Sequence, residues 1–108
     1  MAEAAELSDQ PLFSCRNCQN PLALRSNLLS KNFWGKTGPA YLFSHAMNII
    51  VGQKEDRQLI TGLYTIADIY CCNCGEVLGW KYLRSYDVRH KNREGKFIIE
   101  RAKISKEY

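Results

Sequence analysis

Two Cys-x-x-Cys pairs are the residues whose type and spacing most clearly point to chemistry: Cys15 with Cys18, and Cys71 with Cys74. Both side chains of such a pair can reach one ion at about 2.3 Å, and two pairs supply the four ligands of tetrahedral zinc. The spacer between the pairs is far longer than the loop of about 12–15 residues in a zinc finger. We therefore expect one structural zinc that joins two hairpins distant in the sequence.

Other uses of the cysteines are weaker. A redox Cys-x-x-Cys usually begins a helix after a strand, which lowers the thiol pKa, and neither pair has a flank that predicts a helix. Buried free cysteines are the remaining alternative. Cys72 lies inside the second pair and is either a spacer residue or a reactive thiol.

The sequence offers no catalytic constellation. It has no Ser/His/Asp spacing, no paired carboxylates and no Gly-rich phosphate loop. His45 and His90 are not needed as ligands if four cysteines complete the tetrahedron. We expect that the protein is not an enzyme.

Short apolar or alternating runs separated by glycine-containing turns predict a mainly β domain. Residues 52–58 are predicted to form a charged turn, residues 26–43 loops broken by glycine and proline, and residues 85–96 a loop or short turn. Strands are expected within residues 11–24, 40–52, 59–71, 76–88 and 96–104.

Composition and charge fit one small globular domain of 108 residues. The net charge of +4, concentrated after residue 81 and interleaved with acids, argues against nucleic-acid binding. No apolar run reaches the length of about 20 residues that spans a bilayer, and the first ten residues do not resemble a signal peptide. We expect a protein of the nucleus or cytoplasm with no membrane partner. Cysteines stay reduced in these compartments.

The spacing of the cysteines, together with other positions, resembles the yippee-like family, and most closely its plant members. The resemblance covers residues 12–104 and includes the segments AYLFSHAMNIIVG, ITGLYTIADIYCCNCGEVLGWKY and EGKFIIERAKI. One segment, YLRSYDVRHKNREGK, departs from the family pattern at Asn92 and Arg93. The matching positions are Cys15, Cys18, Gly38, Leu42, Asn48, Gly62, Cys71, Cys74, Gly79 and Trp80.

The resemblance implies a β-tent, in which two antiparallel sheets meet at an angle and are clamped by one structural zinc. It places that domain at residues 12–104, between a flexible tail at 1–11 and a short tail at 105–108. It also implies a non-enzymatic protein-interaction module, an adaptor or regulator associated with a ubiquitin-ligase assembly. A sulfoxide-reductase activity, found on the same fold, would need a reactive cysteine on a late strand, and none follows Cys74.

The alternative function is a pocket for a small molecule or a modified residue. The segment around Trp80 is similar to the part of cereblon that supplies an aromatic cage, and such cages read cations or imides. Trp80 and Tyr82 match two aromatic positions there, and Tyr64 matches a third only with an insertion. Trp80 is either a core residue beside the zinc or a pocket wall, and Trp34 is either a second wall or an exposed anchor for a partner.

Overall fold

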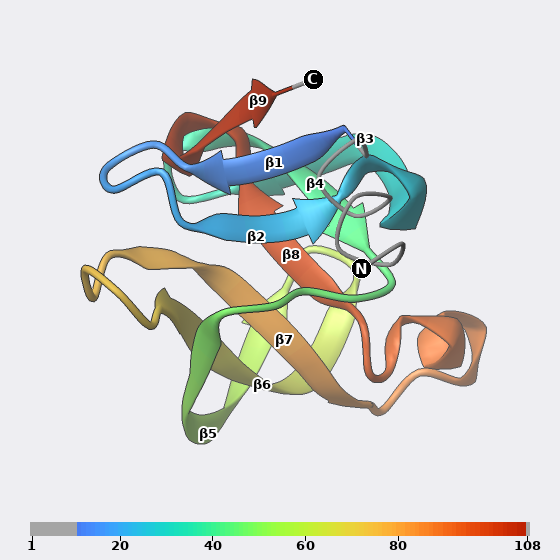
Figure 1. Cartoon of the computed structure of the whole chain (residues 1–108). Coiled ribbons are helices and arrows are strands. Elements are labelled where there is room, and N and C mark those ends of the chain that lie inside the picture. The colour runs from blue at the N-terminus through green and yellow to red at the C-terminus, as the bar shows by residue number, and fades with distance from the viewer. Residues whose placement is uncertain (1–10, 108) are drawn as a thin grey trace, which may run out of the picture.

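The computed structural model describes residues 11–107, which form nine strands and three short 3-10 helices in two antiparallel sheets (Figure 1). The first ten residues, expected to be a flexible tail, and Tyr108 lie outside the described residues. The strands are β1 (Leu12–Cys15), β2 (Pro21–Leu24), β3 (Leu28–Gly35), β4 (Gly38–Phe43), β5 (Ile49–Leu59), β6 (Gly62–Cys71), β7 (Val77–Ser85), β8 (Phe97–Glu100) and β9 (Ile104–Glu107). The helices are η1 (Arg25–Asn27), η2 (Val88–Arg93) and η3 (Arg101–Lys103).

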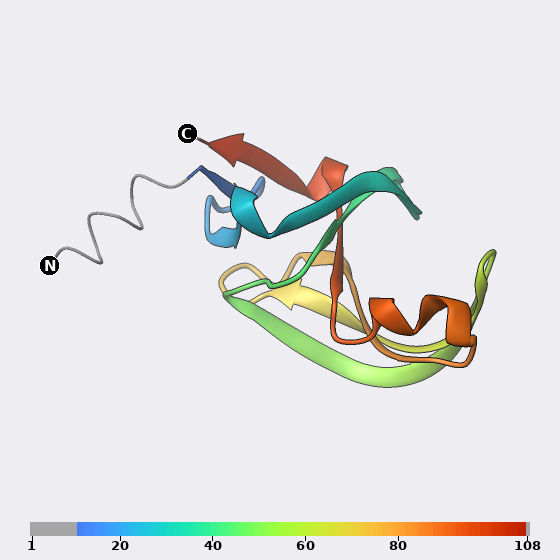
Figure 2. The same cartoon turned by 90° about the vertical axis from the view of Figure 1, so that its right-hand side faces the viewer.

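The smaller sheet has the strand order β2-β1-β9 and the larger one the order β3-β4-β8-β7-β6-β5. Every strand pair is antiparallel. Figure 2 shows β5, β6 and β7 as one layer, with β1 and β9 in the opposite layer. The expectation of a mainly β fold with two antiparallel sheets is confirmed.

The last strand extends further than the sequence suggested. β9 pairs with β1 from Cys15 and Ile104 out to Leu12 and Glu107. Residues 105–107, expected to belong to a tail, are therefore part of the sheet, because the backbone of β1 offers them hydrogen-bond partners.

Two segments predicted to be turns or loops are strands. Residues 52–58 lie within β5 and residues 28–35 form β3. These are the two edge strands of the larger sheet. An edge strand has one neighbour and much solvent contact, so it tolerates charges that also discourage pairing with another molecule.

Two predicted strands are interrupted. The run 40–52 is divided between β4 and β5, because the chain must leave the β3 side of the larger sheet and cross to its far edge. The run 96–104 divides around η3, where the chain passes from the larger sheet to the smaller one. The polar run 85–96, predicted to be a loop or a short turn, instead contains the 3-10 helix η2, whose start is capped by the Asp87 side chain accepting from the Arg89 N–H at 2.9 Å.

The buried side chains form two clusters separated by β4 and β8. Ile98 and Ile99, adjacent on β8, contribute to different clusters, and this explains the continuous apolar run there. Gly79 on β7 makes the tight packing against β8 possible, because a Cβ at this position would lie 2.0 Å from the Ile98 carbonyl oxygen. One cluster surrounds the cysteines, with Phe13, Leu22, Phe43, Ile69, Leu78, Ile99 and Ile104. The other contains Ala40, Leu42, Tyr64, Ile66, Trp80, Tyr82 and Ile98.

Candidate functional site

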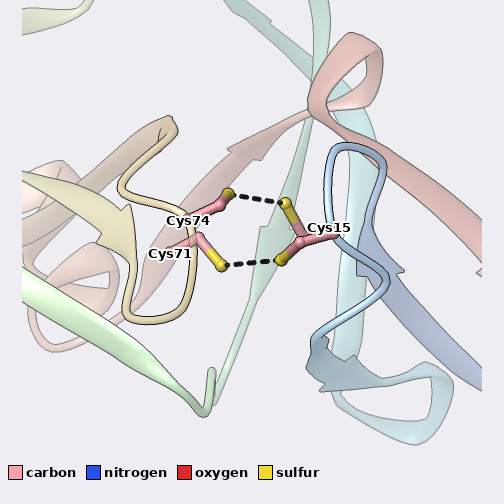
Figure 3. Close-up of side chains that lie close together, drawn as sticks. Cys15, Cys71 and Cys74 are labelled. Carbon is pink, nitrogen blue, oxygen red and sulfur yellow. Dashed lines mark hydrogen bonds between the residues drawn. The ribbon is translucent and has the colours of Figure 1, made fainter.

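The four cysteine thiols of the two Cys-x-x-Cys pairs converge between the sheets (Figure 3). Their sulfur atoms all lie within 4.8 Å of one another. The Cys15 and Cys74 sulfurs are 3.6 Å apart, and those of Cys18 and Cys71 are 3.5 Å apart. In a tetrahedral zinc–thiolate centre with bonds of about 2.3 Å, the sulfurs would be about 3.8 Å apart. The four thiols therefore fit one such ion.

The two loops that carry the cysteines have the same backbone design. In the first, the Cys15 carbonyl accepts from the Gln19 N–H at 2.7 Å, and in the second the Cys71 carbonyl accepts from the Gly75 N–H at 2.9 Å. Gln19 and Gly75 both have positive φ, at 68° and 79°. This left-handed residue turns the chain back after the second cysteine, so that both thiols of a pair point to the same side.

Two asparagines form hydrogen bonds that connect these loops, and neither was assigned a role from the sequence. Asn48, at φ 57°, donates from its side chain to the Pro21 carbonyl at 2.7 Å, and its own carbonyl accepts from the Cys72 N–H at 3.0 Å. The Asn20 side-chain amide lies 3.5 Å from the Cys71 sulfur. The only sequence signal was the tolerance of asparagine for positive φ and its place in the family spacing.

The protein surroundings of Cys15 and Cys71 shift the pKa values of these two thiols in opposite directions. Burial raises the pKa of Cys15 to about 12. Burial also acts to raise the pKa of Cys71, but hydrogen bonds from the Asn20 side chain and from the backbone N–H groups of Cys74 and Asn73 outweigh it and hold this pKa at about 6. A divalent cation bound to all four sulfurs would favour the thiolate form of each.

The fifth cysteine and the histidines stand outside this centre. Cys72 is exposed, and its sulfur is 3.6 Å from the Asn20 side-chain amide. His45 is exposed beside Ser44, and His90 lies on η2. Neither histidine belongs to the group of metal-ligating side chains found within the described residues.

A separate pocket of about 670 Å³ opens beside the second core cluster. It is bordered by β3 and the turn that follows it, by the β5–β6 turn, by β7 and by η2. Its lining is Asn32, Phe33, Trp34, Gly35, Lys36, Arg57, Leu59, Ile60, Thr61, Trp80, Tyr82 and Arg93.

The aromatic residues singled out from the sequence take different places around this pocket. Trp80 and Tyr82 are buried on one face of β7, in the second cluster rather than in the cluster around the cysteines, and both line the pocket. Trp34 also lines it and is 73% exposed, on strand β3 rather than in a loop. Tyr64 is fully buried and is not among the residues that line the pocket, and its ring packs against that of Tyr82 with centroids 5.0 Å apart.

Comparison with known proteins identifies the family that has this fold and this cysteine cluster. A family model described as Yippee zinc-binding/DNA-binding/Mis18, centromere assembly, matches residues 11–107. The chain belongs to the Yippee-Mis18 family. It is 54% identical to one yippee-like protein of Arabidopsis thaliana over 98 residues, covering 91% of this chain and 93% of the relative. A second from the same plant is 60% identical over 96 residues, covering 89% and 91%.

The yippee fold extends to a solved structure of low sequence identity. The crystal structure of the Mis18 yippee-like domain matches with a TM-score of 0.73 at 14% identity, over 93% of this chain and 97% of that one. At this identity the match concerns the fold. As a yippee zinc-binding domain, the chain has Cys15, Cys18, Cys71 and Cys74 positioned to hold one zinc ion.

Proposed function

We propose that this yippee domain is a non-enzymatic recognition module, built around one structural zinc, that binds partner proteins through the pocket bordered by Trp34 and Trp80. The observation that carries the proposal is a roomy pocket with four aromatic side chains in its lining and, among residues 11–107, no Cys, His, Asp or Glu there. Such a lining can bind an apolar group but supplies no thiol, imidazole or carboxylate, the groups that most often act as nucleophile or general base.

The metal centre supports a structural role for the zinc. Four cysteine ligands fill a tetrahedral site, whereas a catalytic zinc keeps a position open for water or substrate. The two ligand pairs come from the β1–β2 loop of one sheet and the β6–β7 loop of the other. The ion would therefore fix how the two sheets are placed, whereas the residues that line the pocket belong to the larger sheet and its connections.

The family resemblance suggests the partner class: subunits of a ubiquitin-ligase assembly, for which this chain would act as an adaptor or regulator. We place it in the nucleus or cytoplasm, since thiolate ligands stay reduced there. Within residues 11–107, none of the helices has the length and apolarity to cross a membrane.

We do not extend the DNA binding named in the family description to this chain. Several of its C-terminal cations are already paired: Arg89 with Asp87 at 2.6 Å, Lys91 with Glu94 at 3.2 Å, and Lys103 with Glu76 at 2.9 Å. Paired cations offer less to a phosphate backbone, whose neutralisation dominates nucleic-acid affinity.

Affinity purification of the tagged chain, with mass spectrometry of the bound proteins, tests this function. Trp34→Ala removes an exposed wall of the pocket, and Val88→Ala removes an equally exposed apolar side chain that does not line it. Both variants are first checked for bound zinc and for an unchanged melting temperature. Partners lost with Trp34→Ala and kept with Val88→Ala support the proposal, whereas partners kept by both variants place the interface elsewhere.

A small molecule or a modified residue is the second candidate occupant. Its support is the volume of the pocket, which falls within the range of about 300–1,000 Å³ typical of small-ligand sites. Two results together would favour the second candidate. Trp34→Ala would leave the recovery of partner proteins unchanged, and the same variant would abolish the binding of a small ligand.

A further inference from the structure

The charge around the pocket has one sign. Lys36, Arg57 and Arg93 line it, and no carboxylate from residues 11–107 does. Arg57 is already paired, at 3.0 Å from Glu55 and 3.7 Å from Asp68. Lys36 is exposed on the turn after β3. Arg93 is the half-buried cation of the lining that has no carboxylate partner among the described residues.

Arg93 is held in place by aromatic rings and hydroxyl groups. Its guanidinium lies 5.0 Å from the centroid of the Phe33 ring and 5.9 Å from that of Tyr64. Its Nη1 donates to the Thr61 hydroxyl at 2.9 Å and to the Tyr64 hydroxyl at 2.8 Å. These contacts fix the plane of the group without neutralising it.

No carboxylate of residues 11–107 binds this guanidinium. Within the described residues Arg93 makes no ion pair, and a further neighbour is the Tyr82 hydroxyl, whose pKa is raised by burial while the guanidinium acts to lower it. The carboxylate of Glu100, which lies behind Gly35, already accepts from Thr37 through the backbone N–H at 2.7 Å and through the hydroxyl. An oriented, half-buried guanidinium with spare donors is a receptor for a carboxylate.

We propose that the pocket takes a carboxylate next to a bulky apolar group, as an acidic segment of a partner protein presents it, and that Arg93 binds that carboxylate. The apolar group would lie against Trp34 and Trp80. This inference rests on the proposed function, since it names the chemistry of the partner at the same pocket. It also excludes the cationic ligand of an aromatic cage, because Arg93 already occupies the faces of Phe33 and Tyr64 and repels an ammonium group.

Three small probes of one shape test the charge preference: 2-naphthoate, 2-naphthamide and 2-naphthylmethylammonium. Binding is followed by the two indole N–H signals of Trp34 and Trp80 in nitrogen-15 NMR spectra, assigned with Trp34→Phe. Because hydrogen bonds to charged groups contribute about 1.5–3 kcal/mol, naphthoate should bind about 10- to 100-fold more tightly than the amide, and the ammonium should not bind. Equal binding of naphthoate and naphthamide overturns the inference but leaves an apolar pocket, and so the proposed function, standing.

Variants then locate the carboxylate. Arg93→Gln should abolish the preference for naphthoate, while Arg101→Gln, which removes the same charge from an exposed position outside the pocket, should keep it. A preference that survives Arg93→Gln contradicts the assignment to Arg93. If Arg93→Gln does not fold, the comparison of the three probes on the natural chain still decides the charge preference.

Peptides test the source of the carboxylate. A blocked peptide Gly-Trp-Glu-Gly should shift the same indole signals more strongly than its Gln and Lys counterparts. Binding of naphthoate without binding of the Glu peptide would overturn the protein source and assign the pocket to free small acids. If no probe binds and partner recovery still depends on Trp34, the inference fails while the proposed function survives.

Discussion

The two tryptophans of the chain show how the same residue type divides between core and recognition. Trp80 is 6% exposed and packs among the buried residues of β7, whereas Trp34 is 73% exposed on an edge strand. The Trp80 Nε1 is buried and makes no hydrogen bond within the described residues. The sequence left core and pocket open for Trp80, and the geometry gives it both, since it is buried and forms one wall of the pocket.

Replacing each tryptophan separates these roles. Trp80→Ala should lower the free energy of unfolding by about 3–5 kcal/mol, because it leaves a large cavity in the core. Trp34→Ala should change it by less than about 1 kcal/mol, since little buried area is lost. Trp80→Phe should cost less than about 2 kcal/mol, because it keeps a ring and removes the unpaired donor. Urea unfolding of the zinc-loaded proteins measures all three, and equal effects of the two alanine variants would refute the division.

Asn48 is a second residue whose importance is conformational. Its left-handed backbone and its side-chain bond to Pro21 join the β4–β5 connection to the first cysteine loop. Asn48→Gly keeps the backbone freedom and loses only the side-chain bond, so it should cost about 1 kcal/mol. Asn48→Ala loses both and should cost about 1–2 kcal/mol more. Thermal unfolding of the two variants is the measurement, and a glycine variant less stable than the alanine variant would contradict this account.

At the scale of elements, the sequence predicted central strands better than edge strands. β6 carries the apolar residues expected of a strand with two neighbours. β3 and β5 have one neighbour each and no fully buried residue, so their patterns resemble those of loops. Their strand character comes from pairing with β4 and β6, a tertiary effect that local sequence does not contain.

The β7–β8 contact gives an element-scale prediction, because these strands lie in the middle of the larger sheet. Gly79→Ala would place a Cβ 2.0 Å from the Ile98 carbonyl oxygen, which a central pair of strands can accommodate only by separating. We expect a loss above about 3 kcal/mol. Gly95→Ala is the matched control: its φ is 82° but the space around it is open, so backbone strain alone should cost about 1–2 kcal/mol. Melting temperatures of the two variants test this, and equal losses would mean that backbone strain rather than close packing governs Gly79.

At the scale of the whole molecule, the metal ligands were predictable and the pocket was predictable only in part. Four cysteines in two Cys-x-x-Cys pairs predict a zinc site from the sequence alone. The pocket is formed by β3, the β5–β6 turn, β7 and η2. These segments are distant from one another in the sequence, so no local sequence pattern predicts the pocket. Arg93 illustrates the limit: the sequence marked it as a departure from the family pattern, but only the fold places its guanidinium against Phe33.

The zinc centre joins a loop of the smaller sheet to a loop of the larger one, in the middle of the core cluster that both sheets share, so its removal should act on the entire fold. The free energy of binding a structural zinc, about 10–16 kcal/mol in small zinc domains, is comparable to or larger than the stability of about 5–15 kcal/mol of a typical domain. A strong chelator, or Cys15→Ser, should therefore unfold the protein rather than loosen one loop. Cys72→Ser, an exposed neighbour of the ligands, should keep one zinc per chain and the native fold. Metal analysis and circular dichroism on the same samples provide the test, and a folded, zinc-free Cys15→Ser protein would show that packing between the sheets holds them together without the ion.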